Sequence, residues 1–140
     1  MKDLKQITSQ VEALAAQIQM AMADAKLSAK ATDGLTFAQF QELNAKRCNE
    51  AFAHGVYGWP PAICALAICG EAGELASLIK KVERGEGTYE SATREILFEV
   101  ADVMTYCFLL MSYCGVDAGE VLMEKFDIVS QRVGWHNEES

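Results

Sequence analysis

The chain has 140 residues, 51% of them hydrophobic and 23% charged, which is typical of one globular domain and unlike a disordered chain. Its formal net charge of −8, from 20 acidic and 12 basic residues, opposes general binding to nucleic-acid backbones or anionic lipid surfaces. No apolar run reaches the roughly 18 residues typical of a membrane-spanning helix, and the first residues lack the basic-then-apolar pattern of a signal peptide. We therefore expect a cytoplasmic protein with no nucleic-acid partner and no membrane partner.

Residues 4–30 predict an amphipathic helix, because apolar side chains recur there every three or four residues. The apolar stripe is narrow, and its members are Leu4, Ile7, Val11, Leu14, Ile18 and Met22. Such a stripe can pack against the body of its own chain or against another subunit, and both arrangements stay open. We expect residues 1–33 to be a helical extension within a single domain that spans residues 1–140.

A helix, a loop and a second helix are predicted next. Thr36 and Gln39 form the capping-box pattern that starts a helix, which fades near Gly55. The positions that recur at helical spacing within it are Phe37, Phe40, Leu43, Arg47, Cys48 and Ala51. The following segment, GVYGWPP, predicts a loop, because its glycines and paired prolines oppose regular structure until Pro61 opens a helix. This helix is expected to end near Arg84.

Two further helices complete the predicted elements. One begins at Thr88 or Ser91 and ends at Cys114, where a glycine follows. The other begins at Asp117, which opens a second capping-box pattern, and ends near Gly134. No segment combines strand-like alternation with hairpin turns. The expected fold class is therefore all-α, with a four-helix-bundle-like core and an additional N-terminal amphipathic helix.

The cysteines are predicted to be reduced thiols that mostly pack as small apolar residues. Their number is odd and no two stand at Cys-x-x-Cys spacing: Cys48, Cys64, Cys69, Cys107 and Cys114. Neither a disulfide framework nor a zinc site is expected from them.

Four carboxylates interrupt the two most apolar predicted helices. Glu71 and Glu74 form one pair at i and i+3, and Glu99 and Asp102 repeat this spacing, so that each pair shares a helix face. No basic residue stands at i+4 from any of them, where the sequence has Leu75, Leu78, Val103 and Tyr106. Carboxylates held against apolar surroundings are costly to bury unless a positive group compensates them. The four are therefore candidate metal ligands that we expect to converge between two adjacent helices.

Carboxylate oxygens are the hard ligands that suit Mg²⁺ or Mn²⁺, and these ions keep waters and bind phosphate oxygens. The pattern therefore indicates phosphoryl or pyrophosphoryl chemistry, in which metal ions neutralise charge and activate a bound water. Gly70 and Gly73 stand beside the first pair and are costly inside a helix. We expect them to allow another helix to approach closely.

Three alternatives to this metal site are open. A di-iron carboxylate bundle normally uses Glu-x-x-His pairs, and His54 and His136 both lie outside the acidic pairs. Nucleophilic catalysis by a cysteine needs an activating histidine or helix N-terminus, for which the sequence offers no support. The plainest alternative is that the four acids only line the solvent edge of amphipathic helices.

Two stretches of the sequence resemble the motifs of a known protein family. GEAGEL at 70–75 and FEVADVMTY at 98–106 resemble the Glu-x-x-Glu and Glu-x-x-Asp motifs of the MazG-like all-α nucleoside triphosphate pyrophosphohydrolase superfamily. The resemblance covers about residues 37–135 and extends to KFDIVSQRVG at 125–134. It implies that residues 34–140 form a catalytic bundle that hydrolyses a nucleoside triphosphate between the α and β phosphates.

The resemblance also implies roles for individual residues. The carboxylates of Glu71, Glu74, Glu99 and Asp102 would bind Mg²⁺, and one of them would orient the attacking water. Lys125 matches a basic residue near the phosphates, and Tyr106 matches a position that lines the nucleotide pocket in dCTP-hydrolysing relatives. Asp127 stands where many relatives have Asn. Relatives assemble as dimers or tetramers, so that a homodimer or homotetramer is expected.

Three more residues are candidates for substrate binding, each with a structural alternative. Trp59 could stack on a base or could plug the loop before the metal helix. Lys80 could reach a phosphate together with Lys81 and Arg84, or these residues could simply favour the negative end of the helix dipole. Arg132 could bind phosphate or form an ordinary surface pair.

The leading hypothesis is a Mg²⁺-dependent pyrophosphohydrolase that converts a (deoxy)nucleoside triphosphate to the monophosphate and pyrophosphate as a nucleotide-pool-cleaning enzyme. A non-catalytic helical interaction module is the alternative from another class. Within the enzyme class, phosphoribosyl-ATP pyrophosphohydrolase is the alternative.

Overall fold

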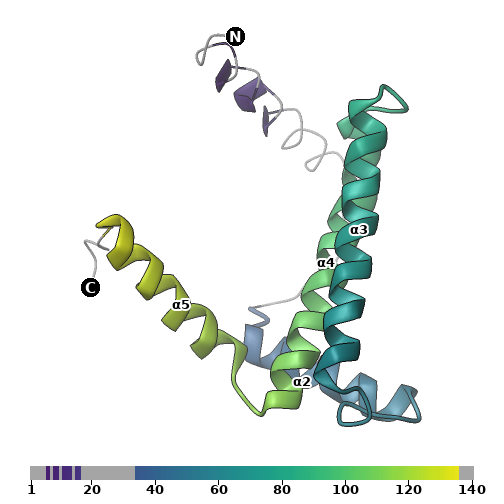
Figure 1. Cartoon of the computed structure of the whole chain (residues 1–140), viewed down its shortest axis with the longest axis vertical. Helices are drawn as coiled ribbons and strands as arrows, with labels where there is room; N and C mark the ends of the chain where they lie inside the picture. Colours follow the sequence, from purple (N-terminus) through teal and green to yellow (C-terminus); the bar gives the residue numbers. More distant parts are fainter. Residues whose placement is uncertain (1–5, 7, 10, 14, 17–33, 136–140) are drawn as a thin grey trace. The chain divides into compact units, whose positions relative to one another are not determined.

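A computed structural model describes residues 6, 8, 9, 11–13, 15, 16 and 34–135 (Figure 1). Four long helices occupy the range 34–135: α2 (Phe37–Ala51), α3 (Pro61–Glu83), α4 (Tyr89–Cys114) and α5 (Ala118–Val133). No strand occurs among the described residues, which confirms the all-α fold class. The helices predicted for the core are all present, with bounds within a few residues of those expected.

Sequence signals account for the helix ends. The Thr36 side chain accepts a hydrogen bond from the Gln39 backbone N–H, and the Gln39 side chain accepts one from the Thr36 backbone, so that the capping box starts α2. At α5, the Asp117 carboxylate accepts a hydrogen bond from the backbone N–H of Glu120 at 3.0 Å. Gly134 then ends α5 in the left-handed conformation, with φ of 69°.

The predicted N-terminal helix falls largely outside the described residues. Residues 6, 8, 9, 11–13, 15 and 16 are helical, which agrees with a helix in this part of the chain. Most of its apolar stripe lies outside the described residues, and the packing of this stripe stays a prediction.

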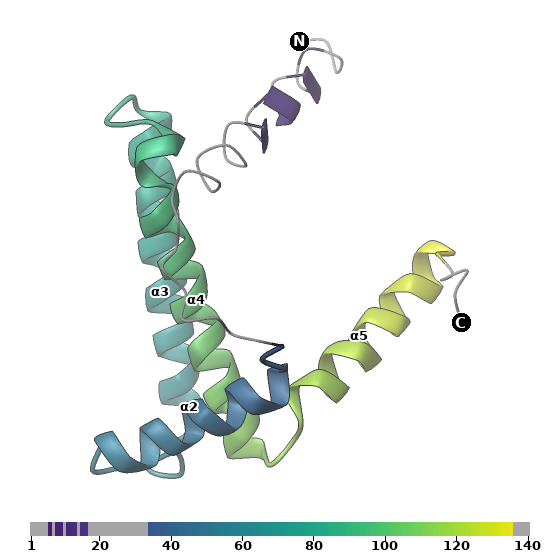
Figure 2. The same ribbon diagram turned by 180° about the vertical axis from the view of Figure 1, so that it is seen from behind.

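The chain divides into two compact units, and the boundaries between them fall inside α3 and α4. One unit comprises Met1–Thr32 and Ile68–Val103 and is called the acidic unit here, while Asp33–Ala67 and Met104–Ser140 form the amide unit. Within the acidic unit, the segments of α3 and α4 lie side by side in both views (Figures 1 and 2). They are joined by a short turn whose glycines, Gly85 and Gly87, have positive φ. The two segments are therefore antiparallel neighbours.

The amide unit takes its name from two buried amide side chains of α2. Gln41 donates to the Val116 carbonyl oxygen and accepts from the Ala118 backbone N–H, both at 2.8 Å. Asn44 donates to the Thr105 carbonyl oxygen at 2.9 Å. Their exposed fractions are only 9% and 3%. These hydrogen bonds fix α2 against α4 and against the turn before α5.

The apolar core of the amide unit is small. A buried cluster consists of Cys48, Val56 and Leu109, with Ala45, Tyr106 and Tyr113 packed against it. Phe108 is also buried and contacts the rings of Phe37 and Phe40. Phe37 and Leu43 nevertheless remain about half exposed. The α2 face expected from helical spacing is thus only partly buried, because the two amides occupy much of the covered side of this helix.

Helices α3 and α4 are each long and apolar enough to cross a membrane, by length and composition alone. The expectation from uninterrupted apolar runs did not detect them, because the acidic residues divide these runs. Core helices of soluble proteins satisfy the same criteria, so that this observation is weak evidence for a membrane. The cytoplasmic location and the lack of a membrane partner stay predictions.

Candidate metal-binding site

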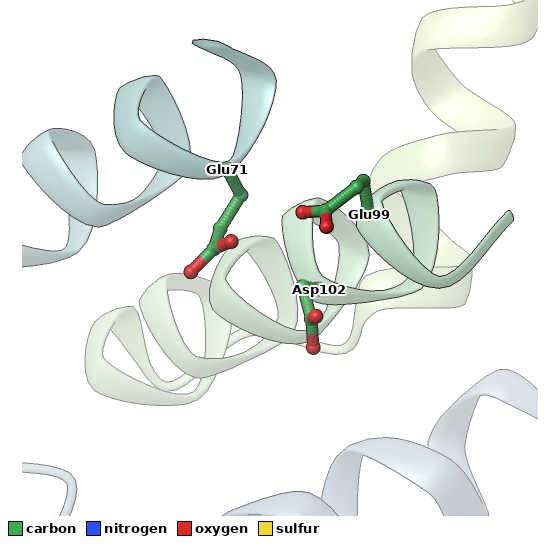
Figure 3. A group of neighbouring side chains, drawn as sticks. All are labelled: Glu71, Glu99 and Asp102. Carbon is green, nitrogen blue, oxygen red and sulfur yellow. The ribbon is translucent and has the colours of Figure 1, made fainter. Parts of the chain in front are cut away.

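Three of the four predicted carboxylates come together in the acidic unit. Glu71 extends from α3 toward Glu99 and Asp102 of α4 (Figure 3). One carboxylate oxygen from each residue lies within 4.8 Å of the other two. Glu71 and Glu99 are partly buried, whereas Asp102 is exposed. We call these three residues the carboxylate cluster.

The fourth predicted ligand, Glu74, does not belong to this cluster. Its side chain is exposed, and its carboxylate is not among the three that converge. Three residues correspond to about 300° of rotation on a helix, so that Glu74 is displaced from Glu71 by about 60° around the α3 axis. The expected convergence of four carboxylates is therefore reduced to three in this structure.

The expectation that Gly70 and Gly73 allow another helix to approach closely is wrong for α4, the neighbouring helix of the acidic unit. Apart from its chain neighbours and the nearby backbone of α3 itself, a Cβ atom added at Gly70 or Gly73 would meet no atom within 4 Å. Both positions lie on the exposed surface of α3, so that they do not bring α4 closer.

The electrostatics of the carboxylate cluster are repulsive. Partial burial raises the pKa of Glu71, and the neighbouring charges of Asp102, Glu74 and Glu99 raise it further. Among the described residues, the one ion pair joins Lys46 to Glu50, so that no described lysine or arginine forms a salt bridge with the cluster. The cluster thus concentrates negative charge that the described chain does not neutralise with a cationic side chain.

The donor set fits a hard divalent cation. All three ligands are carboxylate oxygens, which Mg²⁺ and Mn²⁺ prefer. Oxygens around an octahedral Mg²⁺ stand about 2.1 Å from the ion, and opposite ligands are therefore about 4.2 Å apart. A spread of up to 4.8 Å is somewhat wider than this separation. Small side-chain rotations would bring Glu71, Glu99 and Asp102 onto one ion, with other positions left for water or phosphate oxygens.

The predicted basic residues occupy different places. Lys80 is exposed on α3 and follows Glu71 by nine residues, which places it about half a turn around the axis and about 13 Å along it. It therefore stands on the opposite side of α3 from Glu71. Lys125 and Arg132 are exposed on α5 in the amide unit. Arg132 lies in the last turn of α5, where the helix dipole favours a positive charge.

Trp59 and Tyr106 belong to a ladder of stacked rings within the amide unit. Their rings are nearly parallel, at an interplanar angle of 3° and a centroid distance of 5.7 Å. The Trp59 ring also contacts His54, with centroids 5.0 Å apart, and the imidazole in turn stacks on Phe52. These contacts favour the plug role of Trp59, whereas contact of Trp59 or Tyr106 with a base stays a prediction.

The cysteines show no sign of activation. All five are free thiols, with Cys48 and Cys64 buried but Cys69 and Cys114 exposed. Burial raises the pKa of the Cys48, Cys64 and Cys107 thiols, which disfavours the reactive thiolate. Nucleophilic catalysis by one of these three is therefore poorly supported.

Comparison of the chain with models of protein families, with curated proteins and with solved structures found no match. The functional argument therefore rests on the carboxylate cluster and on the motif that places its residues.

Sequence reasoning missed one contact between a basic residue and an aromatic ring in α4. Arg94 is the second residue of the TREILFEVAD segment of α4, and its guanidinium carbon lies 5.1 Å from the centre of the Phe98 ring. The available signal was the spacing of Arg94, Phe98 and Asp102, each four residues apart.

Proposed function

We propose that the protein is a Mg²⁺-dependent pyrophosphohydrolase that converts a (deoxy)nucleoside triphosphate to the monophosphate and pyrophosphate, with a role in nucleotide-pool cleaning. The carboxylate cluster supports this proposal, because three acidic side chains from two antiparallel helices converge without a cationic partner among the described residues. Such a set favours a divalent cation, and a divalent cation favours a phosphate-rich substrate. The motif resemblance narrows the substrate class to nucleoside triphosphates.

In the proposed reaction, Glu71, Glu99 and Asp102 would hold the metal, and one carboxylate would orient a water molecule. The bound cation would lower the pKa of that water and neutralise charge on the phosphates. The water oxygen bonds to the α-phosphorus while the bond from this phosphorus to the α–β bridging oxygen breaks. Pyrophosphate leaves with the bridging oxygen, and a carboxylate accepts the proton of the water. Partial burial of Glu71 and Glu99 suits this role, because it limits competition from bulk solvent.

A panel of nucleoside and deoxynucleoside triphosphates, incubated with the protein and Mg²⁺, tests the proposal directly. We expect equal amounts of pyrophosphate and monophosphate from at least one nucleotide, and no product from the Glu99→Gln variant. Glu42→Gln is the matched control, because Glu42 is an exposed acid on α2, outside the carboxylate cluster. Release of inorganic phosphate alone, or no turnover of any nucleotide, would contradict the proposal. Phosphoribosyl-ATP is included in the same panel, because its preferred hydrolysis would identify the alternative within the enzyme class, a phosphoribosyl-ATP pyrophosphohydrolase.

We also propose that the enzyme acts as a homodimer or homotetramer. The helix α5 exposes many large apolar side chains, namely Val121, Leu122, Met123, Phe126, Ile128, Val129 and Val133. Exposed apolar surface of this kind favours association with another protein surface. Light scattering coupled to size-exclusion chromatography should give a mass that is two or four times that of the chain, and a monomer at micromolar concentration would contradict the assembly.

The same exposed apolar side chains of α5 favour the second candidate, a non-catalytic helical interaction module. The two candidates differ in what the carboxylate cluster does. An enzyme requires metal-linked stabilisation that disappears in Glu99→Gln, whereas an interaction module should show no shift of Tm with Mg²⁺ in either protein.

A further inference from the structure

We propose that the chain's own N-terminal segment, residues 4–30, packs on α3 within the acidic unit, whatever reaction the protein catalyses. The carrying observation is that this unit has no apolar core. Thr93 is the one buried residue in the range 68–103, and every apolar side chain there is exposed or only partly buried. Burial of apolar surface is the main favourable term in folding, so that the acidic unit needs a further apolar element.

The side of α3 that points away from Glu71 indicates where this element packs. Between Ile68 and Ala76, the residues turned by about 100° or more from Glu71 around the helix axis are exposed and uncharged. These residues form the outer side of α3 and are Cys69, Gly70, Ala72, Gly73 and Ala76. A helix side that faces water normally carries polar residues, as α4 does with its exposed Arg94, Glu95 and Asp102. The apolar outer side of α3 therefore indicates contact with a partner.

The N-terminal segment has the complementary surface. Residues 1–32 belong to the same compact unit as residues 68–103. Large side chains recur along the segment every three or four residues, and such a stripe fits a helix side made of small residues. Val11, the stripe residue that the structure describes, is 60% exposed, so that it is also available for a partner. A helix over residues 4–30 is about 40 Å long and exceeds the roughly 24 Å of α3 in this unit.

Charge favours this segment over a second copy of the acidic unit. Residues 68–103 include eight acidic and four basic residues, whereas residues 1–33 include four of each. Two acidic units would bring like net charges together, which opposes their association. The N-terminal segment is neutral overall and adds no such repulsion. The chain itself thus supplies the better partner for the outer side of α3.

Alkylation of the cysteines with iodoacetamide tests this contact in the full chain. Cys69 lies on the outer side of α3, and Cys114 is an exposed thiol of the amide unit. Each native rate, measured by mass spectrometry of peptides, is divided by the rate of the same thiol in urea. On this scale we expect Cys69 to react about tenfold or more slowly than Cys114, because the segment must open before the thiol is reached.

Val11→Asp should remove most of the protection of Cys69, because it places a charge in the apolar contact. Ala16→Asp is the matched control, since Ala16 is helical and exposed in the same segment but lies on the side opposite the stripe. Equal normalised rates of Cys69 and Cys114 in the wild type would overturn the proposal. Protection that persists in Val11→Asp would also overturn it, and loss of that protection on dilution would identify a second copy as the partner.

Gly73→Leu tests the same contact by the sign of its effect on Tm. On an open helix surface this substitution should raise Tm, because glycine is costlier in a helix than leucine. In the proposed contact the larger side chain separates the segment from α3, so that we expect a lower Tm. A higher Tm would contradict the proposal.

Discussion

In the amide unit, Gln41 and Asn44 are buried and form hydrogen bonds with backbone groups of α4 and of the turn before α5. In the acidic unit, Glu71, Glu99 and Asp102 converge, and no described lysine or arginine pairs with them. Polar groups inside a protein are costly unless they are satisfied. The amides meet this condition within the chain, which identifies them as structural. The three carboxylates are exposed or partly exposed to solvent, so that their mutual repulsion, and not an unsatisfied buried group, is the reason for proposing a bound cation.

The largest expected effect comes from removing a charge of the carboxylate cluster. Glu99→Gln should lower turnover about 100-fold or more and abolish the shift of Tm with Mg²⁺, because one metal ligand becomes neutral. Thermal unfolding with and without Mg²⁺, together with pyrophosphate release, measures both effects. Without metal, the same variant should be no less stable than the wild type, since one repulsive charge is gone. A clear destabilisation there would identify Glu99 as a structural residue like Gln41.

In the amide unit, we expect a substitution to lower stability and to leave the Mg²⁺ shift of Tm unchanged. Gln41→Ala should lower the free energy of unfolding by about 2–3 kcal/mol, because it leaves the Val116 carbonyl and the Ala118 N–H without their buried partner. Urea unfolding measures this change, and the Mg²⁺ shift should survive in the folded fraction. Gln131→Ala is the matched control, since Gln131 is exposed on α5. Equal stability of the two variants would show that the amide contacts carry little energy.

A smaller effect is expected from pH. The folded pKa of Glu71 is raised above its ordinary value of 4.5, so that the folded state holds this proton more tightly than the unfolded state does. Without metal, the contribution of Glu71 to stability therefore falls as pH rises from about that value through the raised pKa. Mg²⁺ binds the deprotonated carboxylates and should oppose this fall. Tm measured against pH for the wild type and Glu71→Gln tests the sign, and a wild-type curve that is identical to the variant curve would contradict it.

The extent of prediction from sequence differs between the two units for a physical reason. Helix ends depend on local residues, and the signals at Thr36, Asp117 and Gly134 located them well. The acidic pairs were recognised because three-residue spacing fixes a shared face. The burial of Gln41 and Asn44 was not predicted, since an amide inside a helix looks like a surface residue until its backbone partners, more than 60 residues away, are known.

The candidate site shows the same limit. Spacing placed Glu71 and Glu74 on one face, but only the packing of α3 against α4 decides which of two glutamates that differ by about 60° in direction reaches the partner helix. The expectation that Gly70 and Gly73 lie at the contact between the two helices also depended on which side of α3 faces α4, and both glycines lie on the exposed surface.

The smallest expected effect distinguishes the structural cluster from the sequence motif. The motif treats Glu74 as equal to Glu71, whereas the structure leaves its carboxylate outside the group of three. Glu74 still contributes to the raised pKa of Glu71, so that its charge acts on the cluster from a distance. Glu74→Gln should therefore weaken Mg²⁺ binding only about two- to fivefold, because it removes a nearby charge and no ligand. Calorimetric titration with Mg²⁺ beside Glu71→Gln gives the comparison. Equal losses of Mg²⁺ affinity in the two variants would show that Glu74 is a fourth ligand, which moves into the cluster when the metal binds. The four-residue motif would then describe the metal-bound site better than the cluster of three does.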